Sequence, residues 1–294
     1  MQIRPRRSVL YMPGSNVRAL DKAKSLPADA LILDLEDAVA PEAKEAARKQ
    51  VCDAVKAGGY GHRELVIRIN ALDTPWGKAD LEAAAQAAPD AVLLPKPGAG
   101  SDITRATEAL AKAGAPEKTR LWAMIETPLA ILNVAEIAAA SKRAGARLDC
   151  LVMGTNDLVK ETRADLSLNR RPALYWLSAT VTAARAFGLD VLDGVYNIFG
   201  DADGLRRECV HARRLGFDGK TLIHPDQVAV ANEVFAPPDA EVAFARKIIA
   251  AFAQPESKGK GVITVEGRMV ELLHAEMAAR TVAIAEAIAR MGAP

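Results

Sequence analysis

Short runs of valine, isoleucine and leucine alternate with longer alanine-rich stretches along most of this chain. The short runs are typical of parallel strands buried on both faces, and the longer stretches are typical of the helices that connect them. We predict eight strands, at residues 8–12, 30–37, 64–70, 91–96, 121–126, 149–157, 189–196 and 220–224. Eight strand–helix units favour a closed (β/α)₈ TIM barrel over an open doubly wound sheet.

The alternation stops near residue 236, where two consecutive prolines interrupt the chain. A helical stretch, a glycine-rich turn, a strand-like segment at residues 262–265 and a long alanine-rich helix follow. We therefore predict a barrel domain over residues 1–235. Residues 236–294 are predicted to form a C-terminal extension of a helix, a short hairpin-like segment and a second helix.

Composition narrows the classes of function. The 294 residues include 38 Lys and Arg against 37 Asp and Glu, and the basic residues are spread along the chain, so we expect no nucleic-acid partner. No apolar run approaches the roughly 20 residues that cross a bilayer, which predicts no membrane association and a cytoplasmic location. The three cysteines, Cys52, Cys150 and Cys209, are isolated and are interpreted as structural thiols.

Polar residues gather where the predicted strands end. In a TIM barrel the catalytic groups come from these carboxyl-terminal strand ends and the loops after them. Strands buried on both faces otherwise avoid charge, because an unpaired buried charge costs several kcal/mol. The residues at these ends are Asp34, Glu36, Asp37, Arg68, Asn70, Lys96, Glu126, Asn156, Asp157, Asp193 and His224. Their convergence on one rim predicts an active site there.

Glu126 and Asp157, from adjacent predicted strands, are the candidate metal ligands. Two carboxylates without nearby cysteine or paired histidine favour Mg²⁺ over Zn²⁺, and Mn²⁺ is an alternative. Each carboxylate can instead form a structural ion pair with Arg68 or Lys96. The spacing alone leaves both interpretations open.

Three further rim residues allow a chemical and a structural interpretation. Arg68 can hold a substrate carboxylate or a thioester oxygen, or it can pair with an acidic neighbour. Lys96 can form a Schiff base, although the metal pair offers a competing way to stabilise an enolate. His224 is more often a hydrogen-bonded structural residue than a catalyst.

The segment at residues 11–16, Tyr-Met-Pro-Gly-Ser-Asn, ends a predicted strand and opens a helix. Backbone amides at such a turn can bind a phosphate group. A helix cap formed by Ser15 explains the same residues nearly as well.

Taken together, the motifs resemble the citrate lyase β-subunit-like branch of the HpcH/HpaI aldolase superfamily, which includes malyl-CoA and citramalyl-CoA lyases. The similar segments occur in order over nearly the whole length, which makes the resemblance specific. They are residues 7–15, 33–39, 68–70, 94–96, 125–128, 154–158, 220–225 and 259–271.

The resemblance implies a barrel assembled as a trimer or hexamer, with Mg²⁺ held by Glu126 and Asp157. It implies that Arg68 contacts the reacting acyl group, and it places Glu36 and Asp37 among the catalytic candidates. The CoA-binding region would include residues in the N-terminal turn and the following helix, namely Tyr11, Pro13, Gly14, Ser15 and Lys22.

The resemblance also implies that the C-terminal extension reaches a neighbouring subunit and delivers an acidic general acid/base, at the position of Glu271. Related lyases usually carry aspartate there. The extra methylene of glutamate changes the reach to the substrate carbon by roughly a bond length, which matters for proton transfer.

The expected function is that of a Mg²⁺-dependent carbon–carbon lyase. It would reversibly cleave a small 3-hydroxyacyl-CoA, such as malyl-CoA or citramalyl-CoA, to acetyl-CoA or a homologue and a 2-oxo acid. Two alternatives stay open: a malyl-CoA thioesterase, and a citrate lyase β subunit acting on a citryl thioester of an acyl carrier protein. An aldolase acting on free oxo acids is disfavoured by the CoA-like N-terminal turn.

Overall fold

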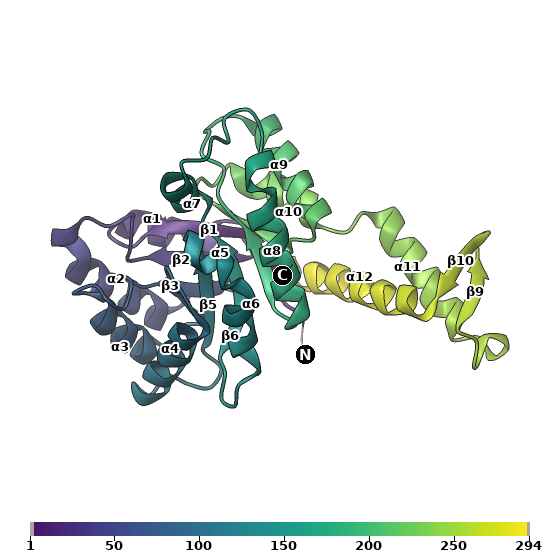
Figure 1. The fold of residues 1–294 in the computed structure, drawn as a ribbon, viewed down its shortest axis with the longest axis horizontal. Coiled ribbons are helices and arrows are strands. Elements are labelled where there is room, and N and C mark those ends of the chain that lie inside the picture. Colours follow the sequence, from purple (N-terminus) through teal and green to yellow (C-terminus); the bar gives the residue numbers. More distant parts are fainter. Residues whose placement is uncertain (1–2, 293–294) are drawn as a thin grey trace. The chain divides into compact units, whose positions relative to one another are not determined.

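The structure is a computed structural model that describes residues 3–292, and it confirms the predicted TIM barrel (Figure 1). Eight parallel strands form a closed ring in which each strand pairs with the next and β1 pairs with β8. The strands are β1 (Ser8–Pro13), β2 (Ala30–Asp34), β3 (Glu64–Arg68), β4 (Ala91–Leu94), β5 (Arg120–Ile125), β6 (Leu148–Met153), β7 (Asp190–Asp193) and β8 (Gly219–Leu222).

Helices follow the strands and cover the outside of the barrel (Figure 1). They are α1 (Val17–Lys22), α2 (Lys44–Ala57), α3 (Gly77–Ala87), α4 (Gly100–Lys112), α5 (Pro128–Leu132), α6 (Val134–Ala139), α7 (Thr155–Thr162), α8 (Leu174–Ala186), α9 (Ala202–Leu215) and α10 (Gln227–Phe235). Short 3₁₀ turns are η1 (Ala23–Ser25), η2 (Pro41–Ala43), η3 (Ala140–Lys142) and η4 (Arg171–Ala173).

The barrel interior is filled by side chains from alternate positions of the strands. Because successive side chains of a strand point to opposite faces, every second residue faces inward. The packed cluster includes Val9, Ile32, Val66, Leu93 and Trp122, all fully buried. On β3 the same alternation turns Arg68 inward at the carboxyl-terminal end of the barrel.

Several strands end earlier than predicted. The strand expected at 30–37 ends at Asp34, and the one expected at 149–157 ends at Met153. Asp157 instead lies in the first turn of α7. The polar residues after each strand therefore belong to loops and helix starts, where side chains can turn toward the barrel mouth.

The described part of the chain divides into two compact units, one of residues 6–232 and one of residues 3–5 and 233–292. The division falls within α10, close to the predicted boundary after residue 235. The C-terminal extension contains α11 (Asp239–Phe252), the 3₁₀ turn η5 (Pro255–Ser257), β9 (Val262–Val265), β10 (Arg268–Glu271) and α12 (Leu272–Met291).

The extension has a small core of its own. Strands β9 and β10 pair as an antiparallel hairpin. Ile248 of α11, Val265 and Val270 of the hairpin, and Ala278 of α12 are buried together. Among residues 3–292, no helix is both long and apolar enough to span a membrane.

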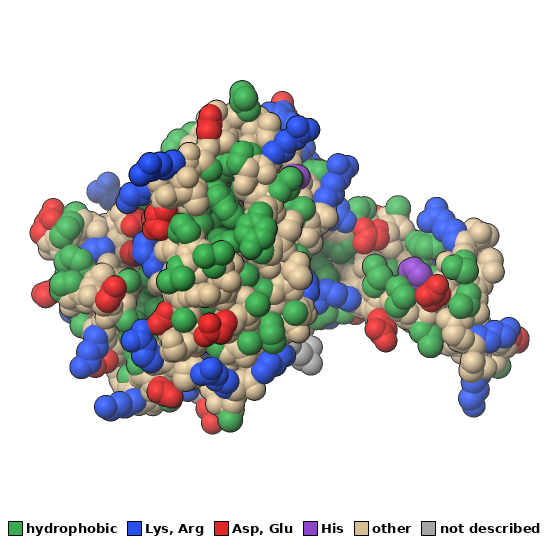
Figure 2. Space-filling model, viewed as in Figure 1, with side chains coloured by type: hydrophobic (Ala, Val, Ile, Leu, Met, Phe, Trp, Pro, Cys, Tyr) green, Lys and Arg blue, Asp and Glu red, His purple; other side chains and the backbone are tan. Residues whose placement is uncertain are grey.

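Both units also expose hydrophobic side chains (Figure 2). On the barrel unit they include Leu132, Tyr175 and Phe199, and on the extension Met269 and Met277, each more than 60% exposed. Large exposed apolar side chains that group together mark surfaces that contact other molecules.

Candidate active site

A pocket of about 330 Å³ lies at the carboxyl-terminal end of the barrel. Residues from β1, β2, β3, β5 and β6 and from the loops after β6, β7 and β8 form its wall. They are Tyr11, Asp34, Asp37, Ala38, Arg68, Met124, Glu126, Met153, Gly154, Thr155, Asn156, Asp157, Val195, Asn197 and Ile223. The pocket thus contains the acidic and basic side chains that the strand ends predicted.

Arg68 is held rigidly at the base of this pocket. Its Nε and Nη2 donate to the two carboxylate oxygens of Asp34, at 2.7 and 2.6 Å. Its guanidinium carbon lies 4.9 Å from the ring centre of Tyr11, a cation–π distance. Both side chains of the Arg68–Asp34 pair are buried, so the guanidinium keeps one fixed orientation. Arg68 therefore both pairs with an acidic neighbour and lines the pocket.

Glu36 and Asp37 follow β2 and differ in environment. Glu36 is buried, and one oxygen lies 2.8 Å from Nη1 of Arg68 while the other accepts a 2.8 Å hydrogen bond from Nζ of Lys96. Burial raises the pKa of Glu36, while Arg68 and Lys96 oppose that rise. Asp37 lines the pocket with a side chain that is 62% exposed, 3.5 Å from Arg68. Glu36 thus joins the two cations, and Asp37 is the more accessible carboxylate.

Lys96 connects the predicted metal ligands to Glu36. Its Nζ lies 3.7 Å from Glu126 and 3.9 Å from Asp157, and it donates to Glu36. Burial lowers the pKa of Lys96, but Glu126 and Glu36 outweigh it, so the pKa is raised. A protonated amine has no lone pair for attack on a carbonyl carbon. The geometry therefore disfavours the Schiff-base interpretation.

Glu126 is fully buried, and its Oε1 accepts a 2.9 Å hydrogen bond from the backbone amide of Lys96. Its Oε2 is buried without a hydrogen-bond partner among the described residues. Burial, with Glu36 as the next cause, raises the pKa of Glu126 to about 8. A buried oxygen without a donor is costly, so Glu126 has a free ligand position.

Gly154 makes room for this carboxylate. A Cβ atom on Gly154 would lie 2.3 Å from Cβ of Glu126 and 2.8 Å from its Oε2. No side chain fits that space without displacing Glu126. The glycine that precedes α7 therefore brings the start of this helix, with Asp157 in its first turn, close to Glu126.

The charges of the pocket fit a bound cation. Arg68 and Lys96 face five carboxylates, those of Asp34, Glu36, Asp37, Glu126 and Asp157, so negative charge is in excess. No group of three or more histidine, cysteine or acidic side chains within residues 3–292 has the spacing of a metal site. Glu126 and Asp157 alone suit Mg²⁺, which is typically held by one or two carboxylates and fills its shell with water and substrate oxygens.

Five predicted rim residues do not line the pocket; Glu36 and Lys96 still contact its charged side chains, whereas Asn70, Asp193 and His224 do not. The amide nitrogen of Asn70 donates to Asp80 and to the carbonyl oxygen of Leu35. Asp193 is fully buried and pairs with Lys220 and Arg170. His224 packs edge-on to another ring, while its neighbour Ile223 lines the pocket. The expected place of Asn70, Asp193 and His224 at the site was wrong, because a strand end fixes the position of a residue and not the direction of its side chain.

Lys44 was missed by the sequence reasoning. It lies at the start of α2, is buried, and donates from Nζ to the carbonyl oxygens of Leu35 (2.9 Å) and Glu36 (2.6 Å). Asn70 donates to the same Leu35 oxygen. These bonds fix the loop that carries Glu36 and Asp37. A lysine at a helix start has no sequence signal that separates it from the exposed lysines of the same helix.

The predicted CoA-binding residues lie on β1, in the turn before α1 and, for Lys22, at the end of α1. Tyr11 lines the active-site pocket, and Ser15 and Lys22 are exposed. Gly14 is buried against the backbone of Asp34, where a Cβ would lie 2.4 Å from the carbonyl oxygen. The side chain of Asn16, and not that of Ser15, caps α1 by accepting from the amide of Ala19. The proposed cap at Ser15 was therefore wrong.

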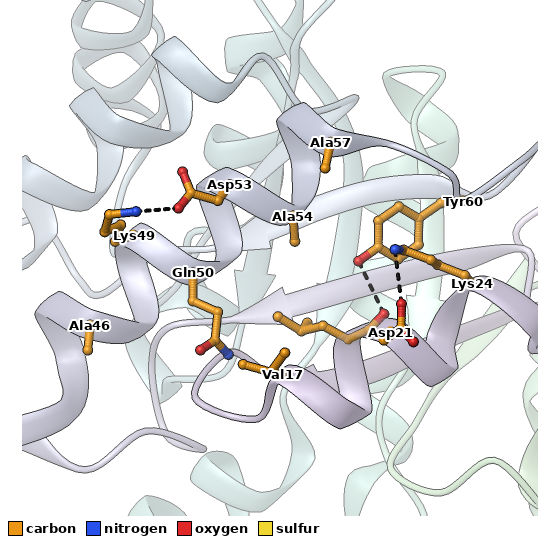
Figure 3. Close-up of a pocket in the computed structure, with 11 residues that line it drawn as sticks. Val17, Asp21, Lys24, Ala46, Lys49, Gln50, Asp53, Ala54, Ala57 and Tyr60 are labelled. Atoms are coloured by element: carbon orange, nitrogen blue, oxygen red, sulfur yellow. Dashed lines mark hydrogen bonds and ion pairs between the residues drawn. The ribbon is translucent and has the colours of Figure 1, made fainter.

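A second pocket, of about 550 Å³, lies between α1 and α2 (Figure 3). Its apolar part includes Val17 and Tyr60, and ion pairs of Lys24 with Asp21 and of Lys49 with Asp53 lie at its edge. Neither Ser15 nor Lys22 lines it. This pocket is therefore separate from the exposed residues that were predicted to bind CoA.

Glu271 is the last residue of β10 and the N-cap of α12. Its backbone amide donates to Nδ1 of His274, 2.9 Å away. The side chain is partly buried within the extension. The role of Glu271 as a general acid/base in the active site of a neighbouring subunit stays a prediction.

Comparison with known proteins gives the same assignment as the motifs. Residues 7–225 match the family model described as HpcH/HpaI aldolase/citrate lyase. A (3S)-malyl-CoA thioesterase of Cereibacter sphaeroides (strain KD131 / KCTC 12085) is 49% identical over 98% of this chain and 97% of the relative. The citrate lyase subunit beta of Escherichia coli (strain K12) is 36% identical over 91% of this chain and 89% of the relative.

Among solved structures, the protein CitE of Mycobacterium tuberculosis, in complex with magnesium, acetoacetate and coenzyme A, is similar to this chain. The two share 32% identity with a TM-score of 0.73, over 95% of this chain and 97% of that one. The family model covers the barrel, and these relatives align over 91% or more of the chain. The chain belongs to the HpcH/HpaI aldolase/citrate lyase family.

Proposed function

We propose that this protein is a thioesterase that hydrolyses a small 3-hydroxyacyl-CoA of the malyl-CoA class. The observation that carries the proposal is the 49% identity, over nearly both full lengths, to a (3S)-malyl-CoA thioesterase. Identity to citrate lyase subunit beta is lower, at 36%. The relatives thus favour the thioesterase alternative over the carbon–carbon lyase expected from the sequence.

The pocket suits a small acyl group. Its volume of about 330 Å³ is at the lower end of the range for small-molecule sites. Arg68 is fixed by Asp34 and Glu36, so its guanidinium can hold the thioester carbonyl oxygen without reorienting. A preorganised donor of this kind stabilises the negative charge that develops on the oxygen during attack.

Glu126 and Asp157 would hold Mg²⁺ in the proposed enzyme. Two observations support this assignment. Oε2 of Glu126 has no hydrogen-bond partner among the described residues, and the carboxylates of the site outnumber its cations. When bound, the metal would supply positive charge that binds and polarises substrate oxygens. The related structure that contains magnesium and coenzyme A is a further support.

In the proposed reaction, water attacks the thioester carbon, the carbon–sulfur bond breaks, and the leaving thiolate takes up a proton. A carboxylate is needed to accept a proton from the attacking water. Asp37, exposed at the edge of the pocket, is a candidate within the chain. Glu271 of a neighbouring subunit is the second candidate, and the exposed apolar side chains of both units support a homo-oligomer.

CoA is proposed to bind along the N-terminal turn. Tyr11 reaches the pocket, while Ser15 and Lys22 lie exposed beyond it along the same segment. A lysine ammonium suits the phosphate groups of CoA as a point charge.

Product analysis tests the proposal. The purified protein is incubated with Mg²⁺ and (3S)-malyl-CoA, and free thiol and 2-oxo acid are measured separately. We expect free CoA thiol and malate in equal amounts, and no thiol release from the Arg68→Met variant. Formation of a 2-oxo acid and acetyl-CoA without free thiol would overturn the thioesterase assignment.

A carbon–carbon lyase is the second candidate, supported by the similarity to citrate lyase subunit beta. The same assay detects it, because cleavage keeps the thioester intact and releases a 2-oxo acid. Repeating the assay with a citryl thioester of an acyl carrier protein separates the carrier-linked alternative from the CoA-linked one.

A further inference from the structure

Lys96 occupies an unusual place among the carboxylates of the pocket. Its ammonium donates to Glu36 at 2.8 Å and lies 3.7 Å from Glu126 and 3.9 Å from Asp157. The side chain is 32% exposed, so solvent screens these charges only in part. A single cation thus serves both proposed metal ligands and the carboxylate beside them.

The backbone at Lys96 is adapted to this arrangement. Its φ angle is +51°, in the left-handed region that non-glycine residues rarely adopt. In this conformation the amide of Lys96 donates to Oε1 of Glu126 at 2.9 Å, while its side chain also approaches Glu126. Two donors of one residue therefore face the same carboxylate.

The other cation of the site, Arg68, acts on Glu126 only without a direct ion pair. Arg68 is engaged by Asp34 and Glu36, and it does not form an ion pair with Glu126 or Asp157. Within residues 3–292, Lys96 is the cation whose ion pairs include both of these carboxylates. Any metal ion that they hold must share them with its ammonium.

We propose that Lys96 is a built-in countercation of the metal site. It holds Glu126 and Asp157 together when no metal is bound, and it lowers the affinity of the site for Mg²⁺. The proposal rests on the proposed function only through the Mg²⁺ site. Charges about 4 Å apart in a partly buried site are only partly screened, so removal of the ammonium has a measurable effect.

The test compares Lys96→Met with Lys160→Met, and neither measurement depends on turnover. Methionine retains a side chain at the positive φ, so the backbone strain stays, while the charge and the hydrogen bond to Glu36 are both lost. Lys160 lies on α7 one turn after Asp157 and is exposed, so its variant controls for a general change in charge. Mg²⁺ affinity is measured by calorimetric titration, and the melting temperature is measured with and without Mg²⁺.

We expect Lys96→Met to bind Mg²⁺ at least about tenfold more tightly than the wild type, which corresponds to about 1.4 kcal/mol. Its metal-free form should melt at a lower temperature, and Mg²⁺ should raise the melting temperature more than in the wild type. Lys160→Met should match the wild type within about twofold in affinity, because surface charges are screened.

Equal or weaker Mg²⁺ binding by Lys96→Met would overturn this inference and leave the proposed function intact. Absence of Mg²⁺ binding to the wild type would overturn the metal assignment of the proposed function together with this inference. If metal-free Lys96→Met does not fold, Lys96→Gln replaces it, because glutamine keeps a donor for Glu36 without the charge. Lys96→Arg, which keeps the charge, should retain wild-type affinity.

Discussion

The two ends of the barrel each contain a buried arginine, but their surroundings differ. At the amino-terminal end, Arg6 donates to Glu64, Asp149 and Asp190, and its guanidinium lies 4.9 Å from the ring centre of Trp122. At the carboxyl-terminal end, Arg68 pairs with Asp34 and Glu36 and lies against a tyrosine ring. Both guanidinium groups are at least nine-tenths buried.

The difference lies in what remains unsatisfied. Around Arg6, each guanidinium nitrogen donates to a carboxylate, and Glu64 accepts through both oxygens. At the other end, one oxygen of the buried Glu126 has no donor among the described residues. The amino-terminal cluster thus stabilises that end of the barrel core with its buried ion pairs. The carboxyl-terminal cluster has a carboxylate oxygen available to bind a ligand, as expected for the catalytic face of a TIM barrel.

Substitution of Arg68 should have the largest effect on activity. Arg68→Lys removes the paired bonds to Asp34 and the fixed position of the charge, so we expect kcat/KM to fall by about 10²- to 10³-fold. Arg6→Lys should leave kcat/KM per folded molecule within about twofold. Steady-state kinetics on both variants check this, and comparable loss in the two would remove the functional distinction between the ends.

Substitution of Arg6 should have the larger effect on folding. Arg6→Met breaks a buried ion pair by removing both Arg6 bonds to Glu64, so the free energy of unfolding should fall by about 3–5 kcal/mol. Denaturant unfolding of the wild type and the variant measures this, with kcat of the folded variant as the control. A stability change below about 1 kcal/mol would show that the amino-terminal cluster does not stabilise that end of the barrel core.

Lys44 tests whether the carboxyl-terminal end depends on its supporting loop. Lys44→Met removes the donor to the backbone carbonyl groups of Leu35 and Glu36, so the side chains of Glu36 and Asp37 should shift. We expect kcat to fall by about 10- to 100-fold with KM within about threefold, because small misplacements of catalytic groups slow the chemical step. Lys49→Met, on the exposed side of the same helix, is the matched control. A fall in stability with kcat unchanged would assign Lys44 a role in folding alone.

The smallest expected effect concerns a third polar cluster, formed between α9 and the outward-facing side chains of β7 and β8. His211 of α9 lies near Arg170 and Asp193, and burial, then Arg170, lowers its pKa below the usual value. Because the unfolded chain binds the proton more readily, the free energy of unfolding should decrease as pH falls below about 6.5, down to the lowered pKa. Thermal unfolding between pH 5 and 8 should show this dependence, and His211→Gln should weaken it. A pH effect on kcat alone would link this cluster to the catalytic end.

Much of the fold could be predicted from the sequence, because hydrophobic runs report burial directly. All eight strands were located, and the motif around Glu126 and Asp157 placed these carboxylates at one rim. The ends of the strands were less predictable. Asp157 was assigned to a strand, yet it lies in the first turn of α7, because the strand ends before Gly154, which approaches Glu126.

Side-chain directions and long-range partners could not be predicted. Asp193 belongs to a strand end like Asp34, but the alternation along β7 turns it away from the barrel interior, toward Lys220 and Arg170. Lys44 and Asn70 reach the same carbonyl oxygen from different elements. Such contacts depend on tertiary packing between residues that are distant in sequence.

The contact between Gly154 and Glu126 gives a criterion for comparing related sequences. A homologous chain with any side chain at this position cannot keep its glutamate in the place described here, whatever the rest of its barrel retains. This one position therefore separates related barrels that can keep this carboxylate geometry from those that cannot.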